Sequence, residues 1–252
     1  MNTFTEKKLC LYVALLLTVL LVAFFIVSAL VSSYGYNEAI AAKCKQKAAE
    51  VILGQTKNTF TIIIDAGHGG EDPGAVANGI SEKNINLAIS KKLKDFFSMT
   101  DINVVLTRID DKLLYKSGEE SKKKFYDLRN RLNISNEYPD SIFVSIHCNK
   151  FPIEKYNGLQ VFYSLSNEKS LLLADSVQKL SKLVMPLNNR EIKMGNNIFI
   201  LEQILTPAIF VECGFISNLE ESIRLSTDEY QNKLSFSIYC GIVNYFGDKN
   251  EN

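Results

Sequence analysis

From residue 60 onward, short runs of apolar and β-branched residues alternate with longer stretches that have helical periodicity. The short runs predict strands, because each is brief and bounded by turn-forming or polar residues. They are Thr61–Asp65, Asn103–Arg108, Ser141–His147, Gly158–Ser164, Asn197–Gln203 and Pro207–Cys213. Apolar residues at spacings of three and four predict helices over 82–97, 167–185 and 228–246. This alternation favours an α/β domain with a largely parallel sheet covered by helices on both faces.

The N-terminal part has a different pattern. Leu9–Val31 contains 23 residues without a charge, which as a helix spans roughly 35 Å and suffices to cross a bilayer. Because Lys7 and Lys8 precede it, we expect residues 1–8 in the cytoplasm and the rest of the chain outside. A cleaved signal peptide is the alternative, but the apolar run is longer than a usual signal core. We predict a transmembrane anchor or uncleaved signal at 9–31, a stalk or linker at 32–58 and a globular domain at 59–248.

The amino-acid composition excludes few classes of function. Lys plus Arg equals Asp plus Glu at 28 each, so no overall charge indicates a nucleic-acid partner. The five cysteines have no regular spacing and predict buried small side chains rather than a disulfide framework.

The candidate chemistry lies where the predicted strands end. The chain has only two histidines: His68 follows the first strand among Gly67, Gly69 and Gly70, and His147 ends the third. Two imidazoles and one carboxylate are a common ligand set for catalytic zinc, and Glu82 is a candidate for the third ligand. Glu212, within an apolar strand, could then exchange a proton with the attacking water and the leaving amine.

Each of these residues also has a simpler interpretation. Either histidine alone would be a hydrogen-bonded structural residue. On the residues alone, Glu82 is better explained as an acid at the positive end of a helix, with Ser81 as its cap. Glu212 is the hardest to explain otherwise, because a carboxylate in an apolar strand is costly unless it is paired. Alternation along the strands directs Cys148 and Cys213 away from the site and favours their burial. The residues alone therefore predict a zinc-dependent hydrolase without naming its substrate.

From about Phe60 to Phe246, the chain resembles the zinc-dependent N-acetylmuramoyl-L-alanine amidases of the amidase-3 type. No single motif is decisive, but their order and spacing together are specific. The matching motifs are Ile64-Asp-Ala-Gly-His-Gly-Gly70, Glu82-Lys-Asn-Ile-Asn-Leu87, Leu106-Thr-Arg108, Ser145-Ile-His-Cys-Asn149 and Pro207-Ala-Ile-Phe-Val-Glu-Cys-Gly-Phe-Ile-Ser-Asn218.

The resemblance implies one zinc ion held by His68, Glu82 and His147, with Glu212 as the catalytic acid and base. It also implies a single domain with a six-stranded sheet. The reaction would cleave the amide between N-acetylmuramic acid and L-alanine in peptidoglycan. Asn149 and Arg131 are candidates for binding the substrate, with structural polar roles as the alternative.

An anchored chain without a wall-binding module resembles the germination-specific amidases, which strip stem peptides from spore cortex so that muramic lactam can form. We therefore predict a single-pass protein of the cell membrane, with its catalytic domain outside the cytoplasm, in the forespore intermembrane space, and controlled by a regulatory protein partner. The alternatives are a vegetative wall amidase, another extracellular zinc peptidase or deacetylase, and a non-catalytic wall-binding protein. The basic stretch Lys112–Tyr126 is interpreted as a solvated insertion.

Overall fold

The computed structural model describes residues 61–98, 100 and 102–249, together with residues 38, 39, 42, 43 and 46. The chain divides into two units, Met1–Lys43 and Cys44–Asn252, and the fold below belongs to the second. The predicted span Leu9–Val31 and most of the predicted linker lie outside the described residues. Among the helices that are described, none has the length and apolar character needed to cross a membrane.

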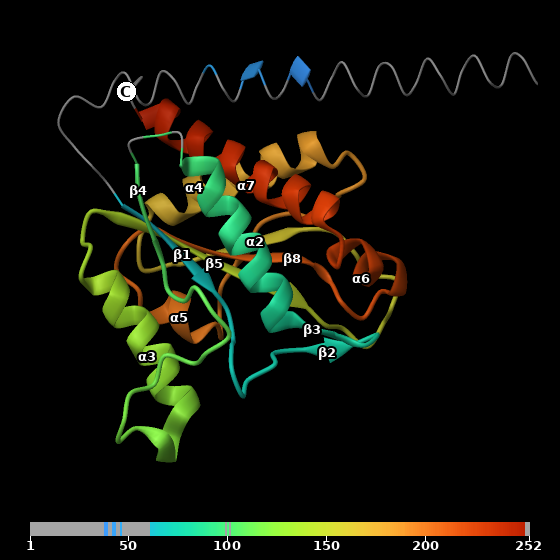
Figure 1. Ribbon diagram of the computed structural model, residues 1–252. Helices are drawn as coiled ribbons and strands as arrows, with labels where there is room; N and C mark the ends of the chain where they lie inside the picture. Colours follow the sequence, from blue (N-terminus) through green and yellow to red (C-terminus); the bar gives the residue numbers. More distant parts are fainter. Residues whose placement is uncertain are drawn as a thin grey trace, which may run out of the picture. The chain divides into compact units, whose positions relative to one another are not determined.

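The centre of the fold is a six-stranded sheet with the strand order β4-β1-β5-β8-β6-β7 (Figure 1). Neighbouring strands are parallel except for β6, which runs antiparallel to β8. The predicted mostly parallel six-stranded sheet is thus confirmed. Its strands are β1 (Thr61–Ala66), β4 (Asn103–Leu106), β5 (Ser141–Asn149), β6 (Gln160–Tyr163), β7 (Lys193–Met194) and β8 (Ala208–Phe215). A separate small hairpin pairs β2 (Val76–Ala77) with β3 (Ile80–Ser81).

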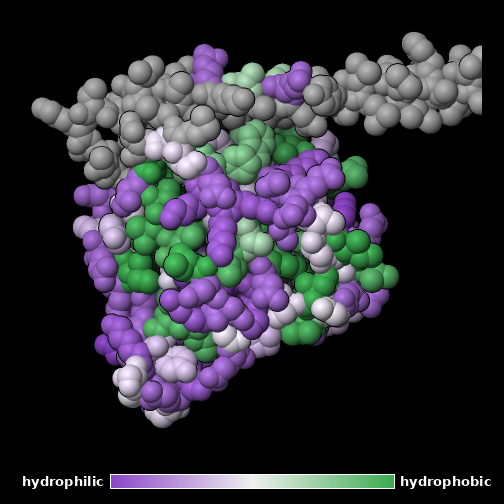
Figure 2. All heavy atoms as spheres, in the orientation of Figure 1, coloured by the Kyte–Doolittle hydropathy of each residue, from purple (hydrophilic) through white to green (hydrophobic). Residues whose placement is uncertain are grey.

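Helices cover both faces of the sheet, as predicted. They are α2 (Glu82–Phe97), α3 (Lys123–Asn136), α4 (Lys169–Val184), α5 (Phe199–Gln203), α6 (Leu219–Leu225) and α7 (Asp228–Lys249), with a 3-10 turn at Glu120–Lys122. One layer contains α2 and α4 against the strands with α7 packed on both, and the other contains α5 with α3 beside it (Figure 1). On the face shown in Figure 2, hydrophilic and hydrophobic residues are interspersed over the helices.

The strand register decides where polar side chains gather. On the face toward α5, the first halves of the strands are apolar, with Ile63 beside Phe143 and Phe143 beside Ala208 in one buried cluster. Farther along the same face, Asp65 pairs with Ser145 and His147 pairs with Glu212. The opposite face is apolar along its length. It consists of the alternate residues of β1, β5 and β8, which are buried under α2, α4 and α7. The sequence therefore places its chemistry at the carboxyl end of one face.

Two predictions about local structure are wrong. The predicted strand Asn197–Gln203 contains the helix α5, whose residues Ile200 and Leu201 are buried against the sheet. The sixth strand is instead β7, which has only two residues. Ser81 holds the position before α2, but its hydroxyl donates to the carbonyl of Pro73 rather than capping the helix.

Candidate metal centre and its catalytic carboxylate

The loop that carries His68 is held by two buried arginines. Arg108 donates from Nε to the carbonyl of Ala66 and from Nη2 to that of Gly67, at 2.8 and 3.0 Å. Arg131 donates to the carbonyls of Ala66 and His68, at 2.8 and 2.9 Å. Three consecutive carbonyls are thus fixed while His68 adopts a φ of 62°, a conformation that a non-glycine residue rarely takes.

His68 is oriented by Asp72. Its Nδ1 lies 2.8 Å from Oδ2 of Asp72, and its Nε2 lies 3.3 Å from Oε2 of Glu82. Burial lowers the pKa of His68, but the hydrogen bonds and charges of Glu82 and Asp72 outweigh it and raise the pKa. A histidine that gives one ring N–H to a carboxylate presents its other nitrogen for a metal, which is the usual arrangement around zinc.

Glu82 begins α2 and is buried, with 4% of its surface exposed. Its Oε1 accepts from the backbone N–H of Cys148 at 3.0 Å and faces Nδ1 of His147 at 2.8 Å. Its Oε2 accepts from the backbone N–H of Ala75 at 2.8 Å. Burial alone would raise the pKa of Glu82, but the hydrogen bonds from His147 and His68 and their charges lower it below its ordinary value. Glu82 is therefore held as an anion.

His147 lies near the end of β5, and its ring stacks on that of Phe210 at a centroid distance of 4.0 Å. Burial lowers its pKa, which favours the neutral imidazole that a metal ion needs. The ring lies against the backbone of Gly67, where a Cβ atom would collide with Nε2 of His147. At Gly74, an added Cβ would come within 2.7 Å of the His68 ring. These glycines make room for the imidazoles.

The three side chains fit a divalent metal. Ligand atoms of His68, Glu82 and His147 all lie within 4.8 Å of one another. Two imidazole nitrogens and one carboxylate form the donor set of a catalytic zinc site, in which a fourth position remains for water. Cys148 and Cys213 are buried free thiols, in agreement with the prediction of their burial.

Glu212 lies beside this cluster on the neighbouring strand, because the register pairs it with His147. Its side chain as a whole is partly exposed, yet its Oε2 is buried and has no hydrogen-bond partner among the described residues. Burial, followed by the nearby charge of Glu82, raises the pKa of Glu212 well above its ordinary value. A carboxyl group with a raised pKa is suited to accept a proton and release it again during a reaction.

Residues 62–244 match the family model Amidase_3, described as N-acetylmuramoyl-L-alanine amidase. The chain belongs to this amidase family. Among curated proteins, it is 32% identical over 192 residues to the germination-specific N-acetylmuramoyl-L-alanine amidase of Bacillus subtilis, covering 75% of this chain and 81% of that protein. Among solved structures, it is 41% identical to the CwlD amidase from Clostridioides difficile in complex with the GerS lipoprotein, with a TM-score of 0.71 over 74% of this chain and 98% of that one. The catalytic domain of CwlV from Bacillus (Paenibacillus) polymyxa is 30% identical, with a TM-score of 0.65 over 74% of this chain and 97% of that one.

The two residues predicted to bind substrate differ in their burial and in their hydrogen bonds. Arg131 is 1% exposed, and its donors are engaged by Asp65, Asp127 and two loop carbonyls. Its prediction as a substrate-binding residue is therefore wrong, because a buried guanidinium whose N–H groups are occupied cannot reach a ligand. Asn149 is half-buried and ends β5 on the His147 face, with no side-chain partner among the described residues. Its role in substrate binding stays a prediction.

The residues that support the candidate metal ligands from behind were not predicted from the sequence. Asp65 accepts from Arg131 at 2.5 Å, Ser145 at 2.6 Å and Thr107 at 2.8 Å. Burial would raise its pKa, but the charge of Arg131 and these hydrogen bonds lower it. The available signal was an acidic residue at the end of an apolar strand, the same signal that identified Glu212.

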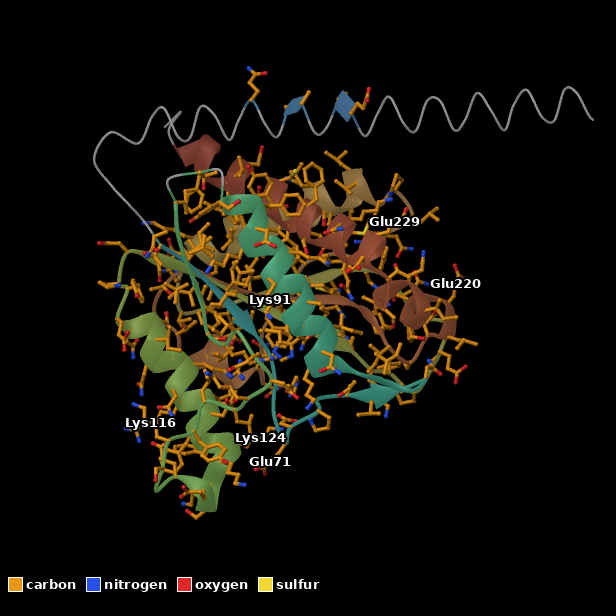
Figure 3. The ribbon with its side chains drawn as sticks, viewed as in Figure 1. Glu71, Lys91, Lys116, Lys124, Glu220 and Glu229 are labelled. Atoms are coloured by element: carbon orange, nitrogen blue, oxygen red, sulfur yellow. The ribbon has the colours of Figure 1, made fainter. Side chains whose placement is uncertain are left out.

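The basic stretch after β4 is not simply a solvated insertion. Asp127 and Asn130 of α3 are buried and bond to the backbone N–H and C=O of Leu114, so this segment is fixed. Its lysines remain outside: Lys123 pairs with Glu71, and Lys124 lies 3.9 Å from Asp72. Figure 3 shows Glu71 and Lys124 near each other at the end of the domain that carries the His68 loop.

Proposed function

We propose that this amidase removes stem peptides from spore cortex peptidoglycan, with one Zn²⁺ held by His68, Glu82 and His147 and with Glu212 as the catalytic acid and base. The observation that carries the proposal is that the metal-binding cluster and the Glu212 carboxyl group are neighbours. A three-residue donor cluster for a metal lies directly beside a buried carboxyl group whose Oε2 has no partner among the described residues.

The chain's own residues supply the proton transfers. A bound Zn²⁺ would act as a Lewis acid toward the scissile carbonyl and lower the pKa of a water molecule. Glu212 accepts the proton of the attacking water at Oε2 and returns it to the alanine nitrogen as the C–N bond breaks. Asp72 holds the Nδ1 proton of His68, and the Phe210 ring holds the plane of His147.

The spore role rests on the relatives. The curated Bacillus subtilis protein is named a germination-specific amidase, and the Clostridioides difficile structure is that of the CwlD amidase. That structure is a complex with the GerS lipoprotein, which supports our proposal that a protein partner regulates this chain as well. The uncharged segment Leu9–Val31 supports a membrane-anchored protein whose catalytic domain lies outside the cytoplasm.

The activity can be tested by incubating the full-length protein with purified peptidoglycan and identifying the new chain ends. We expect free amino groups of L-alanine to appear while the glycan strands keep their length, and chelation to stop their release. New ends elsewhere in the peptide would indicate a peptidase, and free sugar amines would indicate a deacetylase. Binding to the polymer without new ends would indicate a wall-binding protein.

The biological role needs a separate experiment. In a strain that lacks the gene, we expect spore cortex without muramic lactam and vegetative walls of normal composition. A cortex with normal muramic lactam, combined with impaired separation of growing cells, would favour the vegetative alternative.

A further inference from the structure

Arg190 is held in one orientation at the rim of the proposed active site. Its guanidinium carbon lies 4.6 Å from the centre of the Phe215 ring and 5.2 Å from that of Tyr156. Its Nε donates to the carbonyl of Asn157 at 2.9 Å. Two rings and one hydrogen bond therefore fix the plane of the guanidinium group before any ligand arrives.

The terminal nitrogens of Arg190 remain available. Within the part of the chain that the structure describes, the side chain makes no ion pair and no hydrogen bond besides that to Asn157. The side chain of Arg190 is partly exposed to solvent. A fixed fork with free N–H groups is the arrangement that binds a carboxylate through two parallel hydrogen bonds.

The register places the segment that carries Arg190 near Glu212. A shift between His147 and Asn149 pairs Asn149 with Phe215, and paired residues share one face of a sheet, so the Phe215 ring lies on the face of the site. On the other side, Gln160 pairs with Glu212, and its side-chain amide donates to the carbonyl of Glu191 at 2.7 Å. The segment that carries Arg190 thus borders the proposed catalytic carboxylate.

The surrounding charges favour an anion. Lys155 is exposed, and its Nζ lies 5.9 Å from the centre of the Tyr156 ring, so a second cation lies on the ring that holds Arg190. Glu191 is paired with Lys182, and Glu221 accepts from the backbone N–H groups of Gly158 and Phe215. Glu154 is the remaining acid of the loop after β5, and it is exposed.

We propose that Arg190, with Tyr156 beside it, binds a carboxylate of the stem peptide and thereby selects the peptide side of the substrate. The inference rests on the proposed amidase function. The stem peptide carries free carboxylates beyond the L-alanine residue, whereas the N-acetylated glycan is neutral in this region. A carboxylate is therefore the substrate group that matches the fork.

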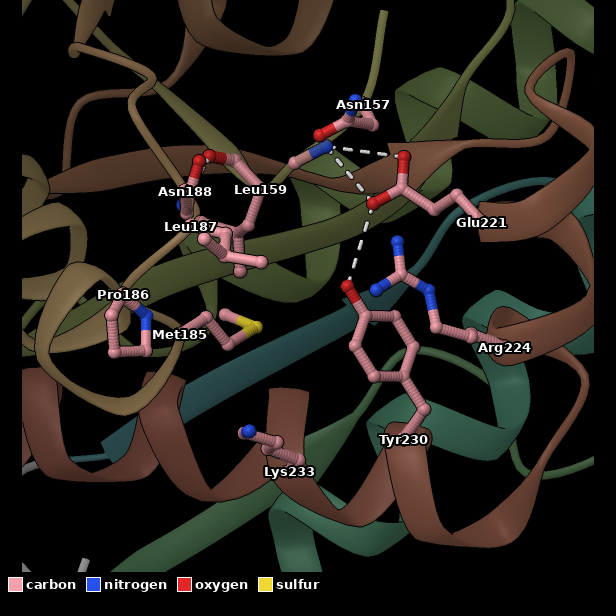
Figure 4. A pocket seen from close by; sticks show the side chains of 11 residues that line it. Asn157, Leu159, Met185, Pro186, Leu187, Asn188, Glu221, Arg224, Tyr230 and Lys233 are labelled. Carbon is pink, nitrogen blue, oxygen red and sulfur yellow. Dashed lines mark hydrogen bonds between the residues drawn. The ribbon is translucent and has the colours of Figure 1, made fainter. Parts of the chain in front are cut away.

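Arg224 offers a matched control, because it too lies over a tyrosine ring. Its guanidinium carbon is 5.2 Å from the centre of the Tyr230 ring. Figure 4 shows Arg224 and Tyr230 with Glu221 in a pocket formed by α6, α7 and the loop before β6. Its Nε is buried without a partner among the described residues. Among the described residues, Arg224 has no ring contact with Tyr156 or Phe215, so its replacement removes a stacked guanidinium and leaves the two rings that hold Arg190.

The test compares full-length wild type, Arg190→Gln, Arg190→Lys and Arg224→Gln on two forms of purified peptidoglycan. In one form the residue after L-alanine carries a free α-carboxylate, and in the other this group is an amide. We expect wild type to prefer the free carboxylate by about tenfold in kcat/KM, mainly through KM. Arg190→Gln should lose this preference, Arg190→Lys should keep part of it, and Arg224→Gln should keep all of it.

Equal losses of Arg190→Gln on both polymers would overturn the inference, because a purely structural role does not distinguish them. A wild type without preference, or an equal effect of Arg224→Gln, would also overturn it. Failure of wild type to release alanine amino groups from either polymer would instead refute the proposed amidase function.

Discussion

Glu82 and Glu212 approach the same cluster from different elements, and their polar surroundings are opposite. Glu82 accepts two backbone N–H groups and faces both imidazoles, and its pKa is lowered. Glu212 comes from an apolar strand, its Oε2 has no partner among the described residues, and its pKa is raised. Two carboxylates in one site are thus prepared for different tasks, one to remain an anion and the other to change protonation.

The largest effect is expected at Glu82. In Glu82→Gln, a neutral amide replaces the anion between the imidazoles and loses acceptor capacity toward Ala75 and Cys148. We expect zinc content to fall from about one ion per chain toward zero, activity to be lost, and the free energy of unfolding to drop by about 1–3 kcal/mol. Metal analysis and urea unfolding measure these effects. Glu71→Gln, at an exposed ion pair, is the control and should bind zinc normally.

Glu212→Gln should separate chemistry from metal binding. Because Glu212 is not among the proposed ligands, we expect zinc content to stay near one while kcat falls about 10²- to 10⁴-fold. Steady-state hydrolysis of peptidoglycan with parallel metal analysis gives both numbers. Turnover within a few-fold of wild type would end the assignment of Glu212 as acid and base.

A smaller effect is expected behind the ligands, at Asp72. Asp72→Asn keeps an oxygen near Nδ1 of His68 but removes the charge that orients and polarises the ring. We expect zinc affinity to fall about 10- to 100-fold, with activity restored by excess zinc. Competition with a chelator measures the affinity. Asp110→Asn, at an exposed carboxylate, serves as the comparison; equal affinities of the two variants would contradict the role of Asp72.

The smallest effect concerns pH and stability without metal. The folded protein raises the pKa of Glu212, so the stability from its protonated form is complete below the unfolded value of about 4.5 and is lost as the pH rises through the folded value. In chelator, Glu212→Gln should therefore unfold at higher urea concentration than wild type, by a margin that grows with pH. A margin that shrinks as the pH rises would show that Glu212 is not destabilised by burial.

The long elements of the fold were predictable because their patterns agree with their burial. β1, β5 and β8 are apolar on both faces for most of their length, and α2 buries Ile85, Ile89 and Leu93 at helical spacing. The segment around α5 was misassigned because Ile198, Phe199 and Ile200 form a β-prone run. Only packing against the sheet decides its helical state, and β7 is too short to leave a periodic signal.

The positions of the candidate ligands followed from strand ends, but their supports did not. α3 has a buried face made of Asp127, Asn130, Arg131 and Ser135, so a search for apolar periodicity cannot find it. The polar buried face of α3 also explains why Arg131 was wrongly predicted to bind substrate, since a charged side chain is normally expected at the surface. Its partners Asp65 and the carbonyl of His68 come from distant positions in the chain, which no local pattern reveals.

The polar inner face of α3 has a consequence for the order of folding. A helix whose fully buried side chains are all polar gains little from docking early, because Arg131 needs the finished loop after β1 as its partner. We therefore expect the sheet to assemble first and the amide protons of α3 to become protected from hydrogen exchange afterwards. A chain caught between these stages would have its strands in place before it could hold His68 in position for a metal.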